Sequence, residues 1–198
     1  LLKPDSGRVF LDGEDVTDFT EQAFFRVRMK CAMVFQNSTL FDSMTLLDNV
    51  ALPIRKHRKV SEAEARELAL GKLELVGMAE EGDRYPADFG DGMRKKVAIA
   101  RALTLDPEYV IFDEPTTGLD PISALIVDRM IRDLSDRVGV TSIVVSHDLR
   151  SIFTVADRIA MLYKGRILLD GTPYDFRNTD DLIVQQFISG SPNGPMEV

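Results

Sequence analysis

The sequence has 198 residues, of which 44% are apolar and 28% are charged, proportions typical of a globular chain with one substantial core. No run of consecutive apolar residues is longer than five, whereas a membrane-spanning helix needs about 20, so we expect no bilayer span. The formal net charge of −8 argues against general affinity for nucleic acid, whose phosphates attract an excess of Lys and Arg. The single cysteine, Cys31, cannot form an internal disulfide, which fits a reducing cytoplasm. We expect Cys31 to be buried as a small apolar side chain.

The first 36 residues predict a hairpin, a helix and a strand. The stretch GRVFLDGEDVTD (7–18) places an Asp-Gly turn between two short segments, the pattern of a β-hairpin. Residues 20–30 follow as a helix. The apolar run CAMVF (31–35) predicts a buried strand that ends at Gln36.

The next part of the chain predicts helices with marked starts. Thr45 with Asp48, and Ser61 with Glu64, have the spacing of helix N-caps. We expect the second of these helices to stop near Gly77. Its apolar face is predicted to comprise Ala65, Leu68, Leu73 and Val76. Residues 38–92 are therefore expected to be mainly helical.

From residue 93 onward the pattern alternates between helices and strands. Residues 93–105 predict a helix that is buried after Lys96, and a second helix is expected to begin at Pro121 with Asp120 as its N-cap. Its core side is predicted to comprise Ile122, Ile126, Met130, Leu134 and Val138, and its polar side Asp128, Arg129, Arg132, Asp133 and Asp136. Buried strands are predicted at 109–113 and 141–147, and a further strand at 158–163. Such alternation indicates a parallel sheet covered by helices.

Polar residues follow three of the predicted strands, at the edge where parallel sheets bind ligands. They are Gln36, the pair Asp113-Glu114, and Ser146-His147-Asp148. A carboxylate such as Asp113 can hold Mg²⁺ or its waters, and Glu114 can take a proton from an attacking water. Acids also commonly end strands for structural reasons alone, so the residue types by themselves leave catalysis open.

The order and spacing of these residues resemble a known family. Gln36, GDGMRKKVAIARAL (90–103), VIFDEPTTGLD (110–120) and SIVVSHD (142–148) are similar, in this order, to the Q-loop, signature segment, Walker B motif with D-loop, and switch histidine of ABC-type ATPases. The resemblance covers essentially the whole chain. It implies an α/β fold of the P-loop NTPase (RecA-like) class, with a parallel sheet core, an inserted helical subdomain and an N-terminal truncation.

The resemblance also implies domain limits. Residues 1–37 would be the N-terminal part of the ATPase core, 38–92 the helical subdomain, 93–165 the remaining core with its motifs, and 166–198 a C-terminal strand, helix and extended tail.

The resemblance assigns roles to individual residues. Asp113 and Gln36 would serve Mg²⁺, Glu114 would deprotonate the hydrolytic water, and His147 would contact the γ-phosphate of ATP. Asp120 would reach a second copy of the subunit; a role as a helix cap alone remains open.

The segments VFQNSTLFDSMTLLDNVALPIRKH (34–57) and 155–190 look most like the ATP-binding subunit of Mla-type transporters. This implies coupling of ATP hydrolysis to phospholipid or lipid transport, peripheral to the cytoplasmic face of the inner membrane. The implied partners are a second ATPase subunit, integral-membrane permease subunits and an Mce-domain lipid-binding protein, with no nucleic acid.

Two further segments have open interpretations. A permease helix would dock on the apolar residues after Gln36, or these residues form ordinary helical core: Leu40, Phe41, Met44, Leu46 and Leu47. The basic run RKHRK (55–59) would face anionic headgroups, although a solvated basic loop is the preferred interpretation.

Two departures from the family pattern affect activity. The 198 residues contain no G-x-x-x-x-G-K-[ST] loop, which cradles phosphates in this class, so we expect poor ATP binding by the chain as written. The family's L-S-G-G signature is replaced by Phe89, Gly90, Asp91 and Gly92, followed by Met93. This loop would face nucleotide bound to the partner subunit. Asp91 is expected to oppose that phosphate or to cap its own helix.

Two alternative functions stay open. A non-catalytic ABC-like subunit that regulates an active one fits the altered signature, but intact Glu114 and His147 oppose it. A soluble ABC ATPase without a transport role is opposed by the acidic charge balance.

Overall fold

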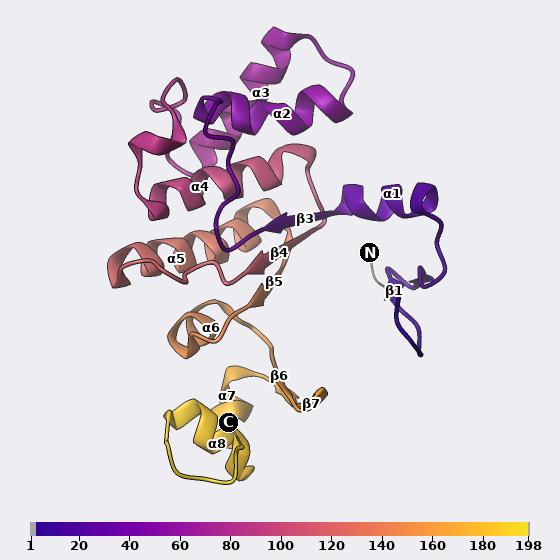
Figure 1. The fold of residues 1–198 in the computed structure, drawn as a ribbon, viewed down its shortest axis with the longest axis vertical. Helices are drawn as coiled ribbons and strands as arrows, with labels where there is room; N and C mark the ends of the chain where they lie inside the picture. Colours follow the sequence, from indigo (N-terminus) through magenta and orange to yellow (C-terminus); the bar gives the residue numbers. More distant parts are fainter. Residues whose placement is uncertain (1–2, 198) are drawn as a thin grey trace.

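The computed structural model describes residues 3–197 and begins with the predicted hairpin and helix. Strands β1 (Phe10–Leu11) and β2 (Glu14–Asp15) pair antiparallel around Asp12 and Gly13, whose φ angles of 51° and 78° make the tight turn. Helix α1 (Glu21–Lys30) starts at Thr20, whose side chain caps it. Both predictions are confirmed, and Figure 1 shows this segment projecting from the side of the molecule.

The centre of the fold is a parallel sheet, as predicted. Its strands lie in the order β3-β4-β5: Cys31–Val34, Tyr109–Asp113 and Thr141–Val145. Met33, Ile111 and Ile143 stand side by side across it. The carboxyl ends of all three strands therefore meet at one edge.

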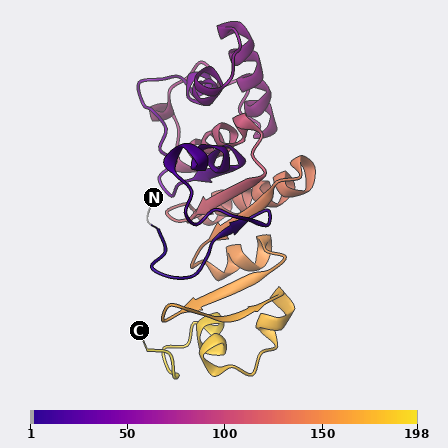
Figure 2. The same cartoon turned by 90° about the vertical axis from the view of Figure 1, so that its right-hand side faces the viewer.

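Helices cover one face of this sheet. Helices α4 (Asp91–Ala102) and α5 (Pro121–Val138) lie on it, and α2 (Leu46–His57) and α3 (Glu62–Leu75) stack on α4 (Figures 1 and 2). Two 3-10 turns, Pro86–Asp88 and Leu103–Leu105, flank α4. The main core combines the sheet and these four helices; its fully buried residues include Leu46, Val50, Leu73, Ile99, Val110 and Ile131.

The opposite face of the sheet is uncovered within residues 3–197, so the prediction of fully buried strands was wrong. Met33 is 43% exposed, Ile143 49% and Val145 53%, because the helices described above pack on the other side. Cys31, expected to be buried, is only half-buried at the start of β3.

The predicted helix caps are confirmed, but one apolar face is shifted. Thr45 accepts a hydrogen bond from the amide of Asp48, and Ser61 accepts one from Glu64. In α3, Ala69 is fully buried, whereas Leu68, which was assigned to the core face, is 36% exposed.

The core face of α5 was predicted only in part: Leu134 is buried and Met130 packs against the core, but Ile122, Ile126 and Val138 are exposed. Its buried residues are Val127, Asp128, Ile131 and Leu134. Ile122 is 73% exposed and Ile126 45%. Residues four apart advance by about 40° around a helix of 3.6 residues per turn, so a five-member stripe at that spacing covers about 160° and leaves the core.

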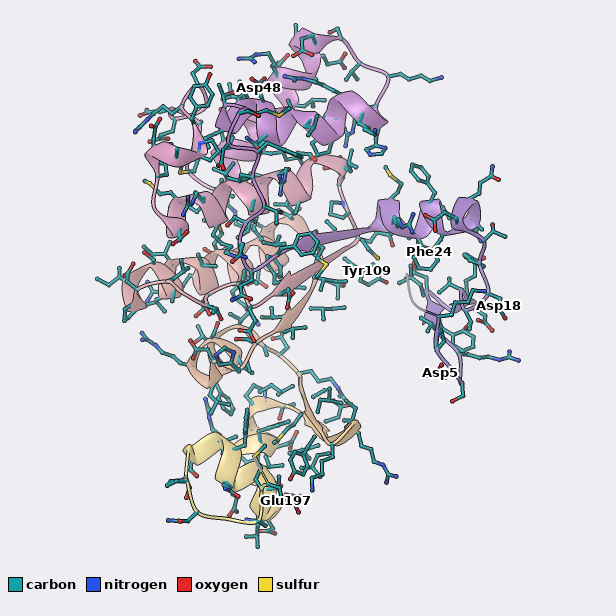
Figure 3. The ribbon with its side chains drawn as sticks, viewed as in Figure 1. Asp5, Asp18, Phe24, Asp48, Tyr109 and Glu197 are labelled. Atoms are coloured by element: carbon teal, nitrogen blue, oxygen red, sulfur yellow. The ribbon has the colours of Figure 1, made fainter. Side chains whose placement is uncertain are left out.

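The basic run at 55–59 is a helix end in its first three residues and lies outside the helix at Arg58 and Lys59, with Lys56, His57 and Lys59 exposed. Residues 55–57 form the last turn of α2. Arg55 pairs with Asp48 of its own helix (2.6 Å) and with Glu62 at the start of α3 (2.7 Å), and Arg58 pairs with Asp106 (2.6 Å) in the turn before β4. Figure 3 labels Asp48 on this helical layer. Two of the basic side chains therefore stabilise contacts between elements.

The C-terminal part forms a second, smaller core. Helix α6 (Leu149–Val155) leads to the antiparallel pair β6 (Ile159–Tyr163) and β7 (Arg166–Gly171), followed by α7 (Pro173–Arg177) and α8 (Leu182–Ser189). Met161, Phe176 and Val184 are buried in this core. Residues 191–197 contain no helix or strand. No helix within residues 3–197 has the length and apolar character needed to span a bilayer.

Candidate active site at the carboxyl edge of the sheet

Glu114 is held in an unusual backbone conformation just beyond β4. Its φ of 47° lies in the left-handed region, which costs free energy for a residue with a Cβ. Its amide donates to the carbonyl of Val145 at the end of β5 (2.8 Å). The next two residues, Pro115 and Thr116, are buried and anchor the turn. The fold thus fixes the direction of the Glu114 side chain.

The carboxylate of Glu114 accepts hydrogen bonds from both neighbouring turns. Thr117 Oγ1 donates to Oε2 (2.8 Å), Ser146 Oγ lies 3.4 Å from the same oxygen, and His147 Nδ1 lies 2.8 Å from Oε1. Burial disfavours the charged form, but the hydrogen bonds from His147 and Thr117 outweigh it, and the pKa of Glu114 lies below its usual range. Glu114 is therefore ionised and oriented at neutral pH.

His147 completes this pair from the end of β5. An ionised carboxylate can only accept, so Nδ1 of His147 carries the proton in the contact with Glu114. The hydrogen bond to Glu114 raises the pKa of His147. Its side chain is 74% exposed, which leaves Nε2 open to a bound molecule.

Asp113 and Gln36 lie at the same edge and offer oxygen atoms. Asp113 is the last residue of β4, and Gln36 lies two residues beyond Val34, the last residue of β3, which pairs with Phe112. Carboxylate and amide oxygens suit Mg²⁺, which also retains water ligands. No group of three or more His, Cys, Asp or Glu side chains within residues 3–197 is arranged to hold a metal. This donor set therefore fits an ion bound partly by substrate and water.

Asp120 caps a helix in this structure. Its Oδ1 accepts from the amides of Ile122 (2.9 Å) and Ser123 (3.0 Å) at the start of α5. The side-chain hydrogen bond with Ser123 lowers the pKa of Asp120, together with these amides. The carboxylate is exposed, so capping and a contact with another molecule are compatible.

The start of α4 corrects one expectation for the signature segment. Gly90 is the N-cap and provides no side-chain cap, while Asp91 is the first helical residue and accepts a hydrogen bond from Arg94. The expectation that Asp91 caps its own helix was therefore wrong. Met93, in the same first turn, is 42% exposed.

Gly92 marks the closest approach of α4 to α5. A Cβ at Gly92 would lie 3.1 Å from both Cβ and Oγ of Ser123. Gly90 has open space around it and an ordinary φ of −71°. The two glycines therefore differ: a side chain at Gly92 would press on Ser123, whereas Gly90 has room for one.

The apolar segment after Gln36 divides into buried and exposed parts. Leu46 and Leu47 belong to the main core, and Leu40 packs against it. Phe41 is 50% exposed and Met44 is half-buried.

Sequence reasoning missed two residues that organise the site, Thr117 and Lys95, and gave no role to Ser146, which it had placed at the strand end. Thr117 and Ser146 hold the carboxylate of Glu114, as described above, and Lys95 is 2% exposed behind Gln36. The hydroxyl residue that follows the two acids was a signal for Thr117. A lysine in a helix gave no signal of burial.

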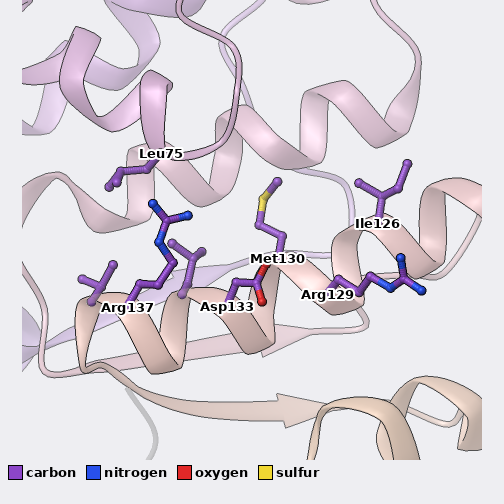
Figure 4. Close-up of a pocket in the computed structure, with 8 residues that line it drawn as sticks. Leu75, Ile126, Arg129, Met130, Asp133 and Arg137 are labelled. Atoms are coloured by element: carbon purple, nitrogen blue, oxygen red, sulfur yellow. The ribbon is translucent and has the colours of Figure 1, made fainter.

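An apolar groove elsewhere on the molecule has a different character. Figure 4 shows side chains of α5 and Leu75 of α3 lining it, including Ile126, Met130 and Arg137. It contains the stripe of α5 predicted for the core except Ile122, and none of the polar residues at the strand ends.

Comparison with known families and proteins agrees with the geometry. The sequence model of the family described as ABC transporter matches residues 1–117. The chain is 36% identical over 195 residues to the intermembrane phospholipid transport system ATP-binding protein MlaF of Haemophilus influenzae, covering 98% of this chain and 74% of that protein. It is 34% identical over 196 residues to the probable ribonucleotide transport ATP-binding protein mkl of Mycobacterium leprae, covering 99% and 56%. The chain thus spans little more than half the length of mkl.

Solved structures share the fold. A dimeric ATP-binding cassette in a post-hydrolysis state, bound to ADP and phosphate, has a TM-score of 0.74 and 30% identity, with 86% of this chain and 75% of that chain covered. CbiO1 of Clostridium perfringens, part of the ABC transporter complex cbiONQ, has a TM-score of 0.83 and 27% identity, with 94% and 74% covered.

Proposed function

The chain belongs to the ABC transporter family, and from this premise we propose that it is part of an ATP-binding subunit that hydrolyses ATP to drive transport. The observation that carries the proposal is the ionised Glu114, fixed beyond β4 by Thr117 and His147. Glu114 takes the proton of a water whose oxygen bonds to the γ-phosphorus, while the bond to the ADP oxygen breaks. Phosphoryl transfer requires mainly such positioning.

Other residues bind and orient in this proposal. Asp113 and Gln36 would hold Mg²⁺, which neutralises charge on the phosphate oxygens. His147 would donate to the γ-phosphate through Nε2, since Nδ1 is engaged with Glu114. In a dimer of subunits, Asp120 and the loop Gly90–Met93 would face nucleotide held by the partner copy.

We propose phospholipid or a related lipid as the transported substrate. The name of the Haemophilus relative supports this, whereas mkl carries a ribonucleotide name. The implied partners are integral-membrane permease subunits and an Mce-domain lipid-binding protein, with this subunit peripheral at the cytoplasmic face of the inner membrane. Residues 38–92 would be its helical subdomain, between core segments 1–37 and 93–165, with 166–198 as the C-terminal segment.

One observation favours a second candidate, a non-catalytic regulatory subunit. Asp91 places a carboxylate where phosphate of a partner's nucleotide would bind, and its side chain is 67% exposed. Such a subunit would bind a partner without turnover of its own.

The substitution Glu114→Gln in the full-length subunit tests the proposal. The amide cannot accept the water's proton, so turnover should fall about 10²–10⁴-fold while nucleotide binding persists. Glu67→Gln on α3, an exposed residue with no ion pair within residues 3–197, is the matched control. Equal turnover in both variants would remove Glu114 from the mechanism, and absence of turnover in the unaltered protein would favour the regulatory candidate.

A further inference from the structure

The strongest unassigned feature is a pair of cations on α4 that bind the backbone after β3. Lys95 Nζ donates to the carbonyls of Phe35 (3.0 Å) and Gln36 (2.6 Å). Arg101 donates to the carbonyls of Ser38 (3.0 Å) and Thr39 (2.8 Å) and to the hydroxyl of Thr39 (3.0 Å). Helix α4 thus makes five hydrogen bonds to one turn.

That turn needs external contacts to keep its shape. Ser38 and Thr39 have φ angles of 60° and 47°, two successive left-handed residues with side chains. Each such residue costs free energy unless its surroundings fix it. Within the turn, the amide of Ser38 donates to the carbonyl of Phe35 (3.1 Å). The amide of Thr39 donates to the carbonyl of Asn37 (2.6 Å), and the donors of α4 add five hydrogen bonds from outside the turn.

Lys95 is the more unusual of the two cations. Its side chain is 2% exposed, and its ammonium reaches the carbonyl of Gln36 itself. Burial lowers the pKa of Lys95, and the charges of Asp91 and Asp113 oppose that shift only in part. A buried ammonium is retained only where hydrogen bonds and nearby charge compensate its lost hydration.

We propose that Lys95 is a positioning residue for Gln36, so that Gln36 and the helix carrying Gly90–Met93 move as one body. This rests on the proposed function, in which Gln36 serves the metal site and α4 faces the partner's nucleotide. When the partner subunit approaches the start of α4, the backbone of Gln36 moves together with α4. Lys95 thereby couples the partner's contact at Gly90–Met93 to the metal site that Gln36 serves.

The first experiment needs neither nucleotide nor turnover. Lys95→Met keeps the length and volume of the side chain but removes its donors, and Lys96→Met on the same helix is the matched control, since Lys96 makes no hydrogen bond or ion pair within residues 3–197. Hydrogen exchange of the Ser38 and Thr39 amides, which donate within the turn, should become about 10–100-fold faster in Lys95→Met alone, the effect of losing hydrogen bonds to a charged donor. The thermal midpoint should not fall, because the substitution also removes a buried charge. If the variant does not fold, Lys95→Gln, which keeps one donor group, should give a smaller acceleration.

The second experiment uses the full-length subunit. Lys95→Met should raise the Mg²⁺ concentration for half-maximal turnover several-fold. Lys95→Gln should raise that concentration less, because it keeps one donor group. Unchanged exchange at Ser38 and Thr39 overturns the proposal, as does an equal rise throughout α4, which would indicate a general core role. Because the exchange measurement involves no ATP, a subunit without ATPase activity would refute the proposed function and leave the test of Lys95 intact.

Discussion

The catalytic candidates are connected through short contacts at the scale of single residues. The left-handed backbone of Glu114 turns its carboxylate toward the end of β5, where His147 Nδ1 lies 2.8 Å from Oε1. A residue with ordinary φ at this position would continue the direction of β4 instead. The strained backbone at Glu114 thus allows its carboxylate to reach His147. Strain of this kind is typical of functional sites.

The Glu114–His147 pair predicts a specific dependence on pH. The hydrogen bond to Glu114 raises the pKa of His147 above its ordinary 6.5. The contribution of His147 to folding stability is therefore complete below pH 6.5 and is lost as the pH rises through the raised pKa of the folded protein. The pKa of Glu114 is lowered from 4.5, so the contribution of Glu114 to folding stability is complete above pH 4.5 and is lost as the pH falls through its lowered pKa. We expect Glu114→Gln to lower the pKa of His147 in an NMR titration, with His147→Asn assigning the signal. Equal pKa values in both proteins would contradict the pair.

A buried carboxyl on α5 gives a second prediction at this scale. Asp128 is 4% exposed and accepts a hydrogen bond from Ser151 of α6, and burial raises the pKa of Asp128. The stability that the folded state gains from keeping Asp128 protonated is complete below pH 3.8 and is lost as the pH rises through the raised pKa of Asp128. Ser151→Ala should cost about 1.5–3 kcal/mol near pH 8, where the carboxylate needs its donor, and less as pH falls. Urea unfolding at several pH values measures this. A cost independent of pH, or one of undiminished size in the Asp128→Asn background, where a neutral amide replaces the carboxylate, would contradict it.

Among the secondary-structure elements, the sequence predicted position better than orientation. The caps at Thr45, Ser61 and Asp120 were correct because each depends on a local hydrogen bond. The predicted face of α5 was right at Leu134 and Met130 but wrong at Ile122 and Ile126, because residues spaced by four drift around the helix. The alternative spacing Val127, Ile131 and Leu134 was present in the same sequence.

The contact between α4 and α5 predicts that a side chain at Gly92 would press on Ser123. In Gly92→Ala, overpacking against Ser123 costs about 1–3 kcal/mol, and the gain in helix propensity returns about 1 kcal/mol. We expect a net loss of roughly 0–2 kcal/mol in urea unfolding. In a double-mutant cycle, Ser123→Gly should relieve the clash, since it removes both close atoms. Strictly additive effects would mean that the two residues do not interact.

For the whole molecule, the order of motifs predicted the site better than composition predicted burial. Parallel strands bring their carboxyl ends to one edge, so Asp113, Glu114 and His147 had to lie near one another once the sheet was recognised. Burial depends on which helices cover which face, and apolar content alone assigned Ile143 to the interior, although it is 49% exposed. Burial of Lys95 was equally hidden, because its compensating carbonyls come from a turn about 60 residues earlier.

The signature segment bears on assembly of two subunits. The carboxylate of Asp91 is 67% exposed and pairs only with Arg94 among the described residues. A unit charge about 5 Å from a phosphate charge is opposed by roughly 3 kcal/mol at an effective dielectric of 20, and by about 1 kcal/mol in water. Loss of a serine hydroxyl at Gly90 removes a further hydrogen bond to a charged group, about 1.5–3 kcal/mol. Gly90 has an ordinary φ and open space, so a serine side chain fits there.

We therefore expect Asp91 to oppose an ATP-bound dimer, and reversal of the change to permit it. The background is the full-length subunit with Glu114→Gln, which slows hydrolysis and preserves any dimer. Sedimentation with and without ATP would compare this protein with the same protein carrying Gly90→Ser and Asp91→Gly. ATP should drive dimerisation only in the second, by a factor of about 10 or more, since 1.4 kcal/mol is tenfold. Strong ATP-dependent dimers before the reversal, or none after it, would show that Asp91 is not the obstacle.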